Sequence, residues 1–375
     1  MNFSTKKCMI AAGFLGVLAV GLVACNQERS SKDSQESTAA KEVKTVEEHY
    51  TFKISDKITR THVRFKNHFG IELAGDLYMP ATVKPGEKFA AMAVAGPYGA
   101  VKEQTSGLHA SQMAERGFVT LAFDPSFTGE SGGEPRGMNA PNINTEDFQA
   151  AVDYLATRDF VDPEKIGIIG ICGWGGYALD AAAIDTRIKA TLVVTMYDMS
   201  RVFQNGYFDK DDNVASRDAF RKALSEQRTE DFKTGTYKNA GGWGSAPMPE
   251  DAPQYVKDYY AYYRTDRGYH ERSLGSNDGF KMTTLTSLMN TKMLAFVNEI
   301  QTPVLLAHGE KAHSRYFGET AFEKMTGKAP EGKSAVVGNK EILIVKDAVH
   351  TDLYDNFDKI PFAKYEEFFT KNLNK

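Results

Sequence analysis

Short apolar runs alternate with helical patterns along most of the chain. Runs rich in β-branched and aromatic residues predict strands at 59–67, 71–79, 89–95, 118–124, 166–171, 189–196, 302–308 and 341–346. Apolar residues spaced three and four apart predict helices at 105–116, 145–158, 175–184, 284–299, 315–326 and 355–372. This order predicts an α/β fold with a mostly parallel eight-stranded sheet and helices on both faces. Ligands bind at the carboxyl ends of strands in such sheets, so functional residues are expected there.

A long segment separates the strands predicted at 189–196 and 302–308. It is too long for one crossover helix, so we interpret 199–290 as a helical cap inserted into a core of 48–198 and 291–375. The cap contains a cluster of tyrosines at Tyr255, Tyr259, Tyr260, Tyr262 and Tyr263. Their rings are expected either to line a substrate site or to pack against the core.

The N-terminal residues have the pattern of an export signal. Lys6 and Lys7 precede an apolar run, 9–23, that is short for a membrane-spanning helix. The sequence Leu22-Val23-Ala24-Cys25 resembles the lipobox of bacterial lipoproteins. This resemblance implies that a signal peptide, 1–24, is removed and that Cys25 is lipidated. An uncleaved membrane anchor is the alternative.

The residues after the lipobox suggest where the protein is anchored and how. Residues 25–47 are polar and lack an apolar period, which predicts a flexible tether. Asn26 follows Cys25, which favours the outer membrane of the cell envelope, facing the periplasm. Because Cys8 would leave with the signal peptide and Cys25 would carry lipid, Cys172 is expected to be the only free thiol.

Composition and charge narrow the function classes. The 375 residues are 42% apolar and 25% charged, which is enough for a large core and excludes a wholly disordered chain or a polytopic membrane protein. A net charge of −4 provides no basic field for phosphates, so no nucleic-acid partner is expected. The scattered histidines and the lack of a phosphate-binding loop predict neither a metal nor a cofactor.

The strongest chemical motif is Gly170-Ile171-Cys172-Gly173-Trp174, where a predicted strand runs into a glycine-rich helix start. It resembles the nucleophile elbow of the α/β-hydrolase superfamily. The resemblance implies an α/β-hydrolase fold, a nucleophilic Cys172, an oxyanion-hole N–H from Gly173, and an elbow or pocket role for Gly170 and Trp174. Trp174 occupies the position of the usual second glycine, where some related bacterial hydrolases have serine. Cys172 is therefore expected to be either the nucleophile or a buried thiol in an inactive elbow.

The same resemblance implies partners for Cys172 at later strand ends. His350 follows the last predicted strand and is expected to be the catalytic base. Glu310, after the penultimate strand, is expected to orient His350, with Asp198 as the alternative acid. Gly96-Pro97-Tyr98-Gly99 resembles the His-Gly-x-Gly loop of the family, which implies that Tyr98 supplies the second oxyanion-hole N–H.

Matching stretches extend over about 59–370, including a loop at 124–133 to which we assign a structural role. They are similar to dienelactone-hydrolase-like and X-Pro dipeptidyl-peptidase-like bacterial hydrolases of unassigned substrate. The resemblance implies an envelope-anchored, esterase-like enzyme that cleaves ester or related acyl bonds of a small-molecule substrate through a covalent acyl-enzyme. The alternative is a catalytically silent α/β-hydrolase fold that serves as an envelope binding protein.

Overall fold

The computed structural model describes residues 48–373, apart from 84–85, 243–247 and 249. The predicted signal peptide, the predicted lipidation site at Cys25 and the predicted tether lie outside the described residues. Within the described part of the chain, no helix has the length and apolar character needed to cross a membrane.

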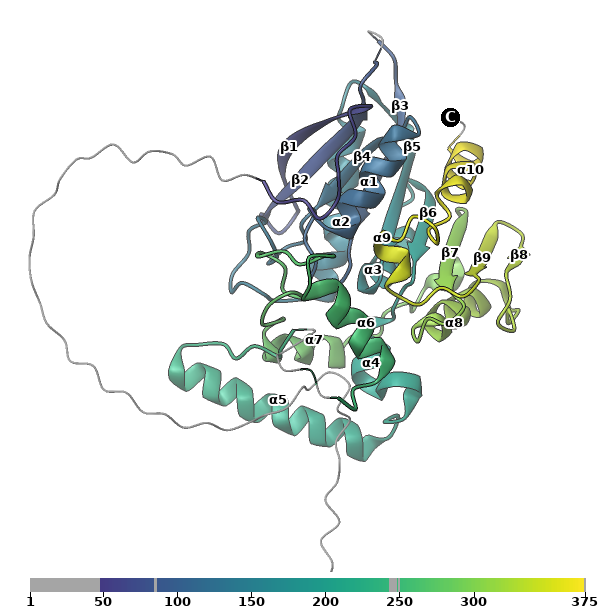
Figure 1. Ribbon diagram of the computed structural model, residues 1–375. Coiled ribbons are helices and arrows are strands. Elements are labelled where there is room, and N and C mark those ends of the chain that lie inside the picture. The colour runs from purple at the N-terminus through teal and green to yellow at the C-terminus, as the bar shows by residue number, and fades with distance from the viewer. Residues whose placement is uncertain (1–47, 84–85, 243–247, 249, 374–375) are drawn as a thin grey trace, which may run out of the picture.

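A single mixed sheet forms the centre of the described chain (Figure 1). Its strands are β1 (Ile58–Lys66), β2 (Glu72–Pro80), β3 (Phe89–Ala95), β4 (Val119–Phe123), β5 (Val161–Ile171), β6 (Ile188–Val194), β7 (Val304–Gly309), β8 (Ala335–Val337) and β9 (Lys340–Val345). Their order is β1-β2-β4-β3-β5-β6-β7-β9-β8, and the pairs from β4 through β9 are parallel. The α/β-hydrolase fold is confirmed, with nine strands instead of the eight predicted. The additional strand, β8, has three residues, too few to show a periodic pattern.

Helices cover both faces of the sheet. They are α1 (Thr105–Glu115), α2 (Pro141–Ala156), α3 (Gly173–Ile184), α8 (Arg315–Thr326), α9 (Asp352–Asp355) and α10 (Phe362–Asn372). Two glycines of β5 permit close packing on opposite faces. A Cβ atom at Gly167 would lie 2.7 Å from the Phe369 ring of α10, and one at Gly170 would lie 2.5 Å from Ala178 of α3. The central strand therefore approaches both helical layers closely, which fixes the start of α3.

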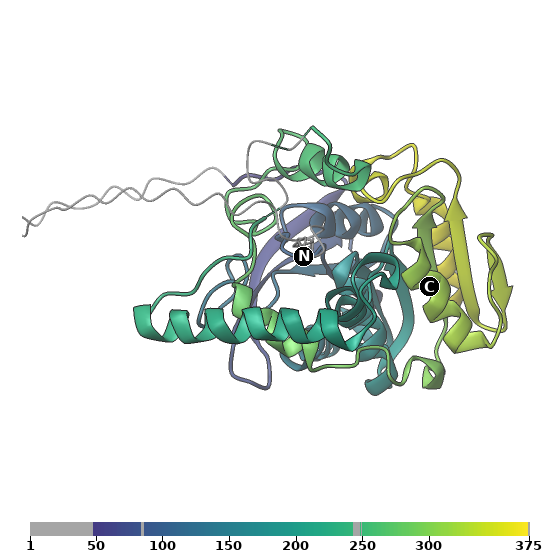
Figure 2. The same cartoon turned by 90° about the horizontal axis from the view of Figure 1, so that it is seen from below.

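The predicted cap segment forms a separate group of helices between β6 and β7 (Figure 1). It contains α4 (Met199–Asn205), α5 (Val214–Thr234), α6 (Gln254–Tyr263), α7 (Leu285–Met289) and the short turns η1 (Tyr207–Asp209) and η2 (Met282–Thr284). Seen from below, the long teal helix α5 lies across this end of the molecule (Figure 2).

The helix predicted at 284–299 is wrong over most of its length. Only α7 and a short turn, η3 (Val297–Glu299), form there. Leu294 has a φ of 57°, which a right-handed helix does not permit, and its N–H donates to Asp180 Oδ1. Buried apolar residues in an irregular segment produced the helix-like spacing.

Candidate active site

The structure places Cys172 on the turn between β5 and α3. Its φ of 56° and ψ of −124° lie outside the ordinary regions for a residue with a side chain. The backbone around it is fixed from both sides, because Cys172 N–H donates to Val194 O at 2.9 Å and Tyr197 N–H donates to Cys172 O at 3.0 Å. The turn is also tight, since a Cβ at Gly173 would lie 2.8 Å from Tyr98 Cβ. These features give the strained strand-to-helix turn on which α/β-hydrolases carry their nucleophile.

Trp174 is accommodated because its side chain points into the core. It is 2% exposed, and its ring centroid lies 4.9 Å from Tyr177, 6.0 Å from Phe148 and 6.5 Å from Phe123. Gly96 makes room for it, since a Cβ there would lie 3.0 Å from Trp174 Cβ. Trp174 is therefore part of the elbow and of the core packing, while the thiol of Cys172 faces the other way.

Two backbone N–H groups converge on the thiol. Tyr98 and Gly173 both bring their N–H groups within hydrogen-bonding reach of Cys172 Sγ. Gly96, with a φ of 108°, allows the Tyr98 loop this approach, because a Cβ would lie only 2.2 Å from Ile171 O. The two predicted oxyanion donors are thus brought together beside the predicted nucleophile.

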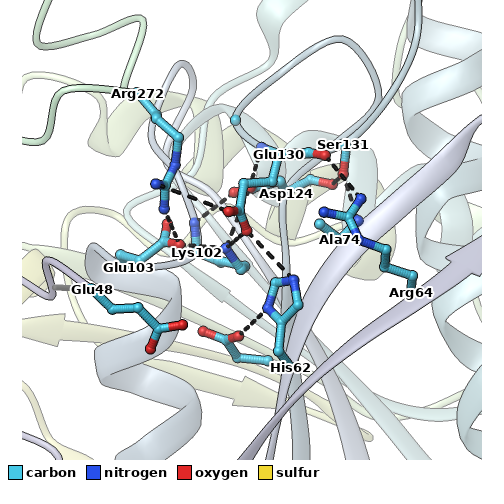
Figure 3. Close-up of polar contacts among 12 residues, drawn as sticks. Glu48, His62, Arg64, Ala74, Lys102, Glu103, Asp124, Glu130, Ser131 and Arg272 are labelled. Carbon is cyan, nitrogen blue, oxygen red and sulfur yellow. Dashed lines mark hydrogen bonds and ion pairs between the residues drawn. The ribbon is translucent and has the colours of Figure 1, made fainter. Parts of the chain in front are cut away.

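A network of charged residues that includes the buried Lys102, Glu103 and Asp124 lies next along the chain from the Tyr98 loop (Figure 3). Lys102 Nζ bonds to Glu130 Oε2 at 2.6 Å and also contacts Glu103 Oε1. Asp124 accepts the N–H groups of Lys102 at 2.7 Å and Glu130 at 2.8 Å, which joins the loop after β3 to the loop after β4. Burial raises the pKa of Asp124, and the Lys102 ammonium opposes this shift. Arg272 of the cap segment pairs with Glu103 at 2.5 Å, so this network also connects the cap segment to the loop after β3.

His350 is held through both ring nitrogens. Nδ1 lies 2.8 Å from Thr195 Oγ1 and 2.6 Å from Ser314 Oγ, and Nε2 lies 3.0 Å from the Tyr354 hydroxyl. That hydroxyl also neighbours the Cys172 thiol and, with the hydroxyl of Tyr259, lowers the pKa of the thiol. Within the described chain, the structure therefore links the predicted base to the predicted nucleophile through Tyr354.

Neither predicted acid contacts His350. Glu310 is exposed, and its Oε2 accepts the N–H of Asp347 at 2.9 Å. Asp198 is the N-cap of α4, and its carboxylate accepts from Arg201 N–H at 2.9 Å and from Ser200 Oγ at 2.7 Å. Hydroxyl groups occupy the place at Nδ1 where a carboxylate was expected. Glu310 instead makes a contact within a loop, and Asp198 instead caps a helix.

Sequence reasoning missed the two hydroxyls because threonine and serine are common at strand and helix ends. Thr195 directly follows β6, and Ser314 directly precedes α8. The unusual feature is conformational: Thr195 has a φ of 47°, which is rare for a β-branched residue. This backbone turn accompanies the contact of its hydroxyl with His350.

Aromatic rings cover the site from the cap side. The Tyr259 ring of α6 lies 5.2 Å from the His350 ring, and its hydroxyl lies 3.0 Å from that of Tyr197. Tyr262 instead bonds to Thr105 of α1 at 2.8 Å, so it packs against the core while Tyr259 lies beside His350. Cys172 is 6% exposed and His350 is 1% exposed. The sulfur and the imidazole are therefore both nearly shielded from solvent in this conformation.

Burial makes the site electrically neutral. Loss of solvent raises the pKa of the Cys172 thiol, although hydrogen bonds from Tyr354 and the two backbone N–H groups lower it in part. Loss of solvent also moves the pKa of His350 well below its usual value, with His313 and His308 adding to the effect. Near pH 7 the resting pair is therefore thiol and neutral imidazole.

One group of described residues has the atoms of a metal site. His49, His270 and Glu271 bring possible ligand atoms within 4.8 Å of one another. However, His270 Nδ1 accepts the N–H of Arg272 at 3.1 Å and its Nε2 lies 3.0 Å from His49 O. Both ring nitrogens are thus used by the protein, and the group lies outside the Cys172 site.

Comparison with known proteins agrees with this architecture. The chain is 45% identical over 373 residues to the uncharacterized protein PA2218 of Pseudomonas aeruginosa, covering 99% of this chain and 96% of that protein. The crystal structure of PA2218 superposes with a TM-score of 0.81 at 47% identity, covering 88% of this chain and 98% of the other.

More distant similarities reach named hydrolases. The α/β-hydrolase GrgF from Penicillium sp. sh18 shares the fold, with a TM-score of 0.67 at 20% identity over 84% of this chain and all of that one. Thiohydrolase aneE of Aspergillus aculeatus is 33% identical over 142 residues, which are 38% of this chain and 43% of aneE. The model of the X-Pro dipeptidyl-peptidase (S15) family matches residues 70–336. The chain belongs to this family of α/β-hydrolases and is a hydrolase.

Proposed function

We propose that this hydrolase cleaves ester or related acyl bonds through a thioester formed on Cys172. The observation that carries the proposal is the convergence on one sulfur of an elbow backbone, two N–H donors and a hydrogen-bonded path to His350. Each of these groups has a role in acyl transfer: the elbow presents the nucleophile, the donors bind the developing oxyanion, and the histidine handles the proton.

In the acylation step, Sγ attacks the carbonyl carbon and the thiol proton passes to His350. The carbonyl electron pair moves to oxygen, which Tyr98 and Gly173 N–H stabilise. Collapse of this intermediate breaks the bond to the leaving group, which takes a proton from the imidazolium. Water then attacks the thioester with His350 as base, which releases the carboxylic acid and restores the thiol.

The substrate is a small molecule with an acyl group that fits beneath the cap. The tyrosines around Cys172 supply an apolar wall with hydroxyl groups, which suits a neutral acyl compound better than a strongly charged one. The name of aneE, a thiohydrolase, supports thioesters as well as oxygen esters within this class.

We further propose that the enzyme is anchored in the bacterial envelope by lipid on Cys25, on the outer membrane facing the periplasm. The lipobox-like residues Leu22-Val23-Ala24-Cys25 and the polar segment after them support this placement. The tether would let the hydrolase domain sample substrates near the membrane surface.

The catalytic proposal is tested by p-nitrophenyl acetate turnover with the full chain in detergent. The expected result is ester hydrolysis and an acetyl adduct on Cys172, seen by mass spectrometry after rapid acid quenching. Cys172→Ala removes both. Glu310→Gln is the matched control and keeps both, because Glu310 lies outside the site. Turnover that survives Cys172→Ala, or a wild-type protein with neither turnover nor adduct, would overturn the proposal in favour of a silent binding fold.

A further inference from the structure

We propose that Tyr354 is a catalytic residue that relays the proton between Cys172 and His350. This inference rests on the proposed function and adds a member to its catalytic machinery. The Tyr354 hydroxyl lies 3.0 Å from His350 Nε2. It is also one of two tyrosine hydroxyls, with that of Tyr259, that neighbour the Cys172 thiol and lower its pKa. Of the two, Tyr354 is the one that also bonds to Nε2 of His350. In the described chain, the hydrogen-bonded partner of Nε2 is this hydroxyl and not the sulfur.

The position of Tyr354 follows from the turn that leads into α9. His350 lies in that turn and Tyr354 lies in α9, which brings the two side chains together at 3.0 Å. Asp352 supports the turn that leads into α9 by accepting the N–H of Val349 at 2.8 Å. Arg267 of the cap segment binds Asp355 and donates to Thr351 O at 2.9 Å, which holds the turn from the other side.

The hydrogen bonds at the other ring nitrogen are compatible with the tautomer that the relay requires, with the proton on Nδ1. Thr195 and Ser314 present hydroxyl oxygens to Nδ1, and both can accept its proton. With Nδ1 protonated, Nε2 keeps a lone pair and accepts from the Tyr354 O–H. The Tyr354 oxygen is then free to accept from the S–H of Cys172. The chain of donors runs from sulfur through oxygen to nitrogen, as a base-catalysed attack requires.

The relay conserves atoms and charge. As the S–C bond forms, the S–H proton moves to the Tyr354 oxygen and the Tyr354 proton moves to Nε2, so tyrosine begins and ends neutral. The imidazolium returns a proton along the same path to the leaving group when the bond to it breaks. Tyr354 is fully buried, and this burial keeps its own pKa well above the usual value, so it transfers a proton without remaining as a phenolate.

The alternative is that Tyr354 only fills space and separates sulfur from imidazole. Tyr354→Phe distinguishes the two roles, because it keeps the ring and removes the hydroxyl. Tyr365→Phe is the matched control: Tyr365 is also fully buried, but its hydroxyl has no hydrogen-bond partner among the described residues. Thermal unfolding of both variants establishes that they fold. If Tyr354→Phe does not fold, 3,5-difluorotyrosine at position 354 keeps the hydroxyl but makes it more acidic.

The measurements are the rate of the acylation burst with p-nitrophenyl acetate, its solvent deuterium isotope effect, and the rate of thiol alkylation by iodoacetamide. We expect Tyr354→Phe to slow acylation by about 10²-fold, at the lower end of general acid–base contributions, with KM nearly unchanged. Alkylation of the thiol should slow as well. The solvent isotope effect on acylation should decrease, because one proton instead of two moves in the transition state when the hydroxyl is absent. Difluorotyrosine should shift the acylation rate, whereas Tyr365→Phe should match wild type.

Equal or faster acylation and alkylation in Tyr354→Phe would overturn the relay, as would an unchanged rate with difluorotyrosine. Failure of the proposed function has a different signature, since wild type and Cys172→Ala would then be equally inactive toward the ester. In that case alkylation still tests the relay, because it reports proton removal from the thiol without acyl transfer.

Discussion

The two hydroxyls at His350 Nδ1 provide a quantitative test of how the base is positioned. Thr195→Val removes one hydroxyl and Ser314→Ala removes the other, while the double variant leaves Nδ1 without either partner. Valine is nearly the same size as threonine and is β-branched as well, so the strained backbone at 195 is equally unfavourable in both proteins.

The expected magnitudes follow from burial. A single hydrogen bond contributes about 1 kcal/mol net, so each single variant should lower kcat/KM by about fivefold. The double variant leaves a buried ring N–H unsatisfied, which costs about 1–3 kcal/mol beyond the first loss because no water reaches a residue that is 1% exposed. We therefore expect the double variant to lower kcat/KM by about 10²-fold. This loss is larger than the product of the two single losses, because in each single variant the remaining hydroxyl still bonds to Nδ1.

The assay is the double-mutant cycle on kcat/KM for p-nitrophenyl acetate, together with urea unfolding of all four proteins. Thr191→Val is the control, since Thr191 is buried on β6, the strand that Thr195 directly follows, and its hydroxyl has no partner among the described residues. It should leave kcat/KM unchanged and maintain or raise the free energy of unfolding. Activities within twofold of wild type for Thr195→Val, Ser314→Ala and the double variant would refute the positioning role.

Three further predictions concern stability, the elbow and localisation. Burial lowers the pKa of His308 to about 3, below its unfolded value, so its stabilising contribution is present above about pH 6.5 and is lost as pH falls. The free energy of unfolding of His308→Leu, measured in urea, should therefore rise relative to that of wild type by up to about 1.4 kcal/mol for each pH unit below pH 6.5. A difference between the two proteins that does not change with pH would contradict this. Trp174→Ala should lower the free energy of unfolding by about 3–5 kcal/mol, and Trp174→Ser should not restore esterase activity to Cys172→Ala, because position 174 faces the core. Globomycin should make the unprocessed precursor accumulate and Cys25→Ala should release the protein from membranes, whereas unchanged partition in fractionation would contradict lipidation.

The sheet was predictable because its central strands are buried on both faces. The run Ile166-Gly167-Ile168-Ile169-Gly170-Ile171 is apolar apart from two glycines, and the structure shows why those two are small: helices approach on each side. Strand edges and irregular segments were less predictable. The three-residue β8 has no detectable period, and the apolar spacing at 284–299 reflects burial without a continuous helix.

The elbow and its donors were predictable for a related reason: they are backbone features marked by glycine and by their place after a strand. The neighbours of His350 could not be predicted in this way. Glu310 was selected as a carboxylate near a strand end, yet its side chain bonds to the backbone of Asp347. Thr195 reaches Nδ1 from a backbone with a φ of 47°, and neither residue type nor sequence position reveals that angle. Tertiary contacts determine which strand-end side chain meets the histidine.

The hydroxyl environment of His350 is consistent with the burial of the whole site. A carboxylate at Nδ1 would have to be desolvated in a resting site that holds no formal charge, which is unfavourable unless an opposite charge is close. Thr195, Ser314 and Tyr354 satisfy both ring nitrogens without introducing a charge. In the proposed mechanism, the same arrangement gives the imidazolium no carboxylate partner at Nδ1, so the oxyanion proposed to bind Tyr98 and Gly173 N–H would be the opposite charge formed beside it. We therefore expect proton transfer and carbonyl attack to be tightly coupled in this enzyme, since neither charge is well stabilised before the other forms.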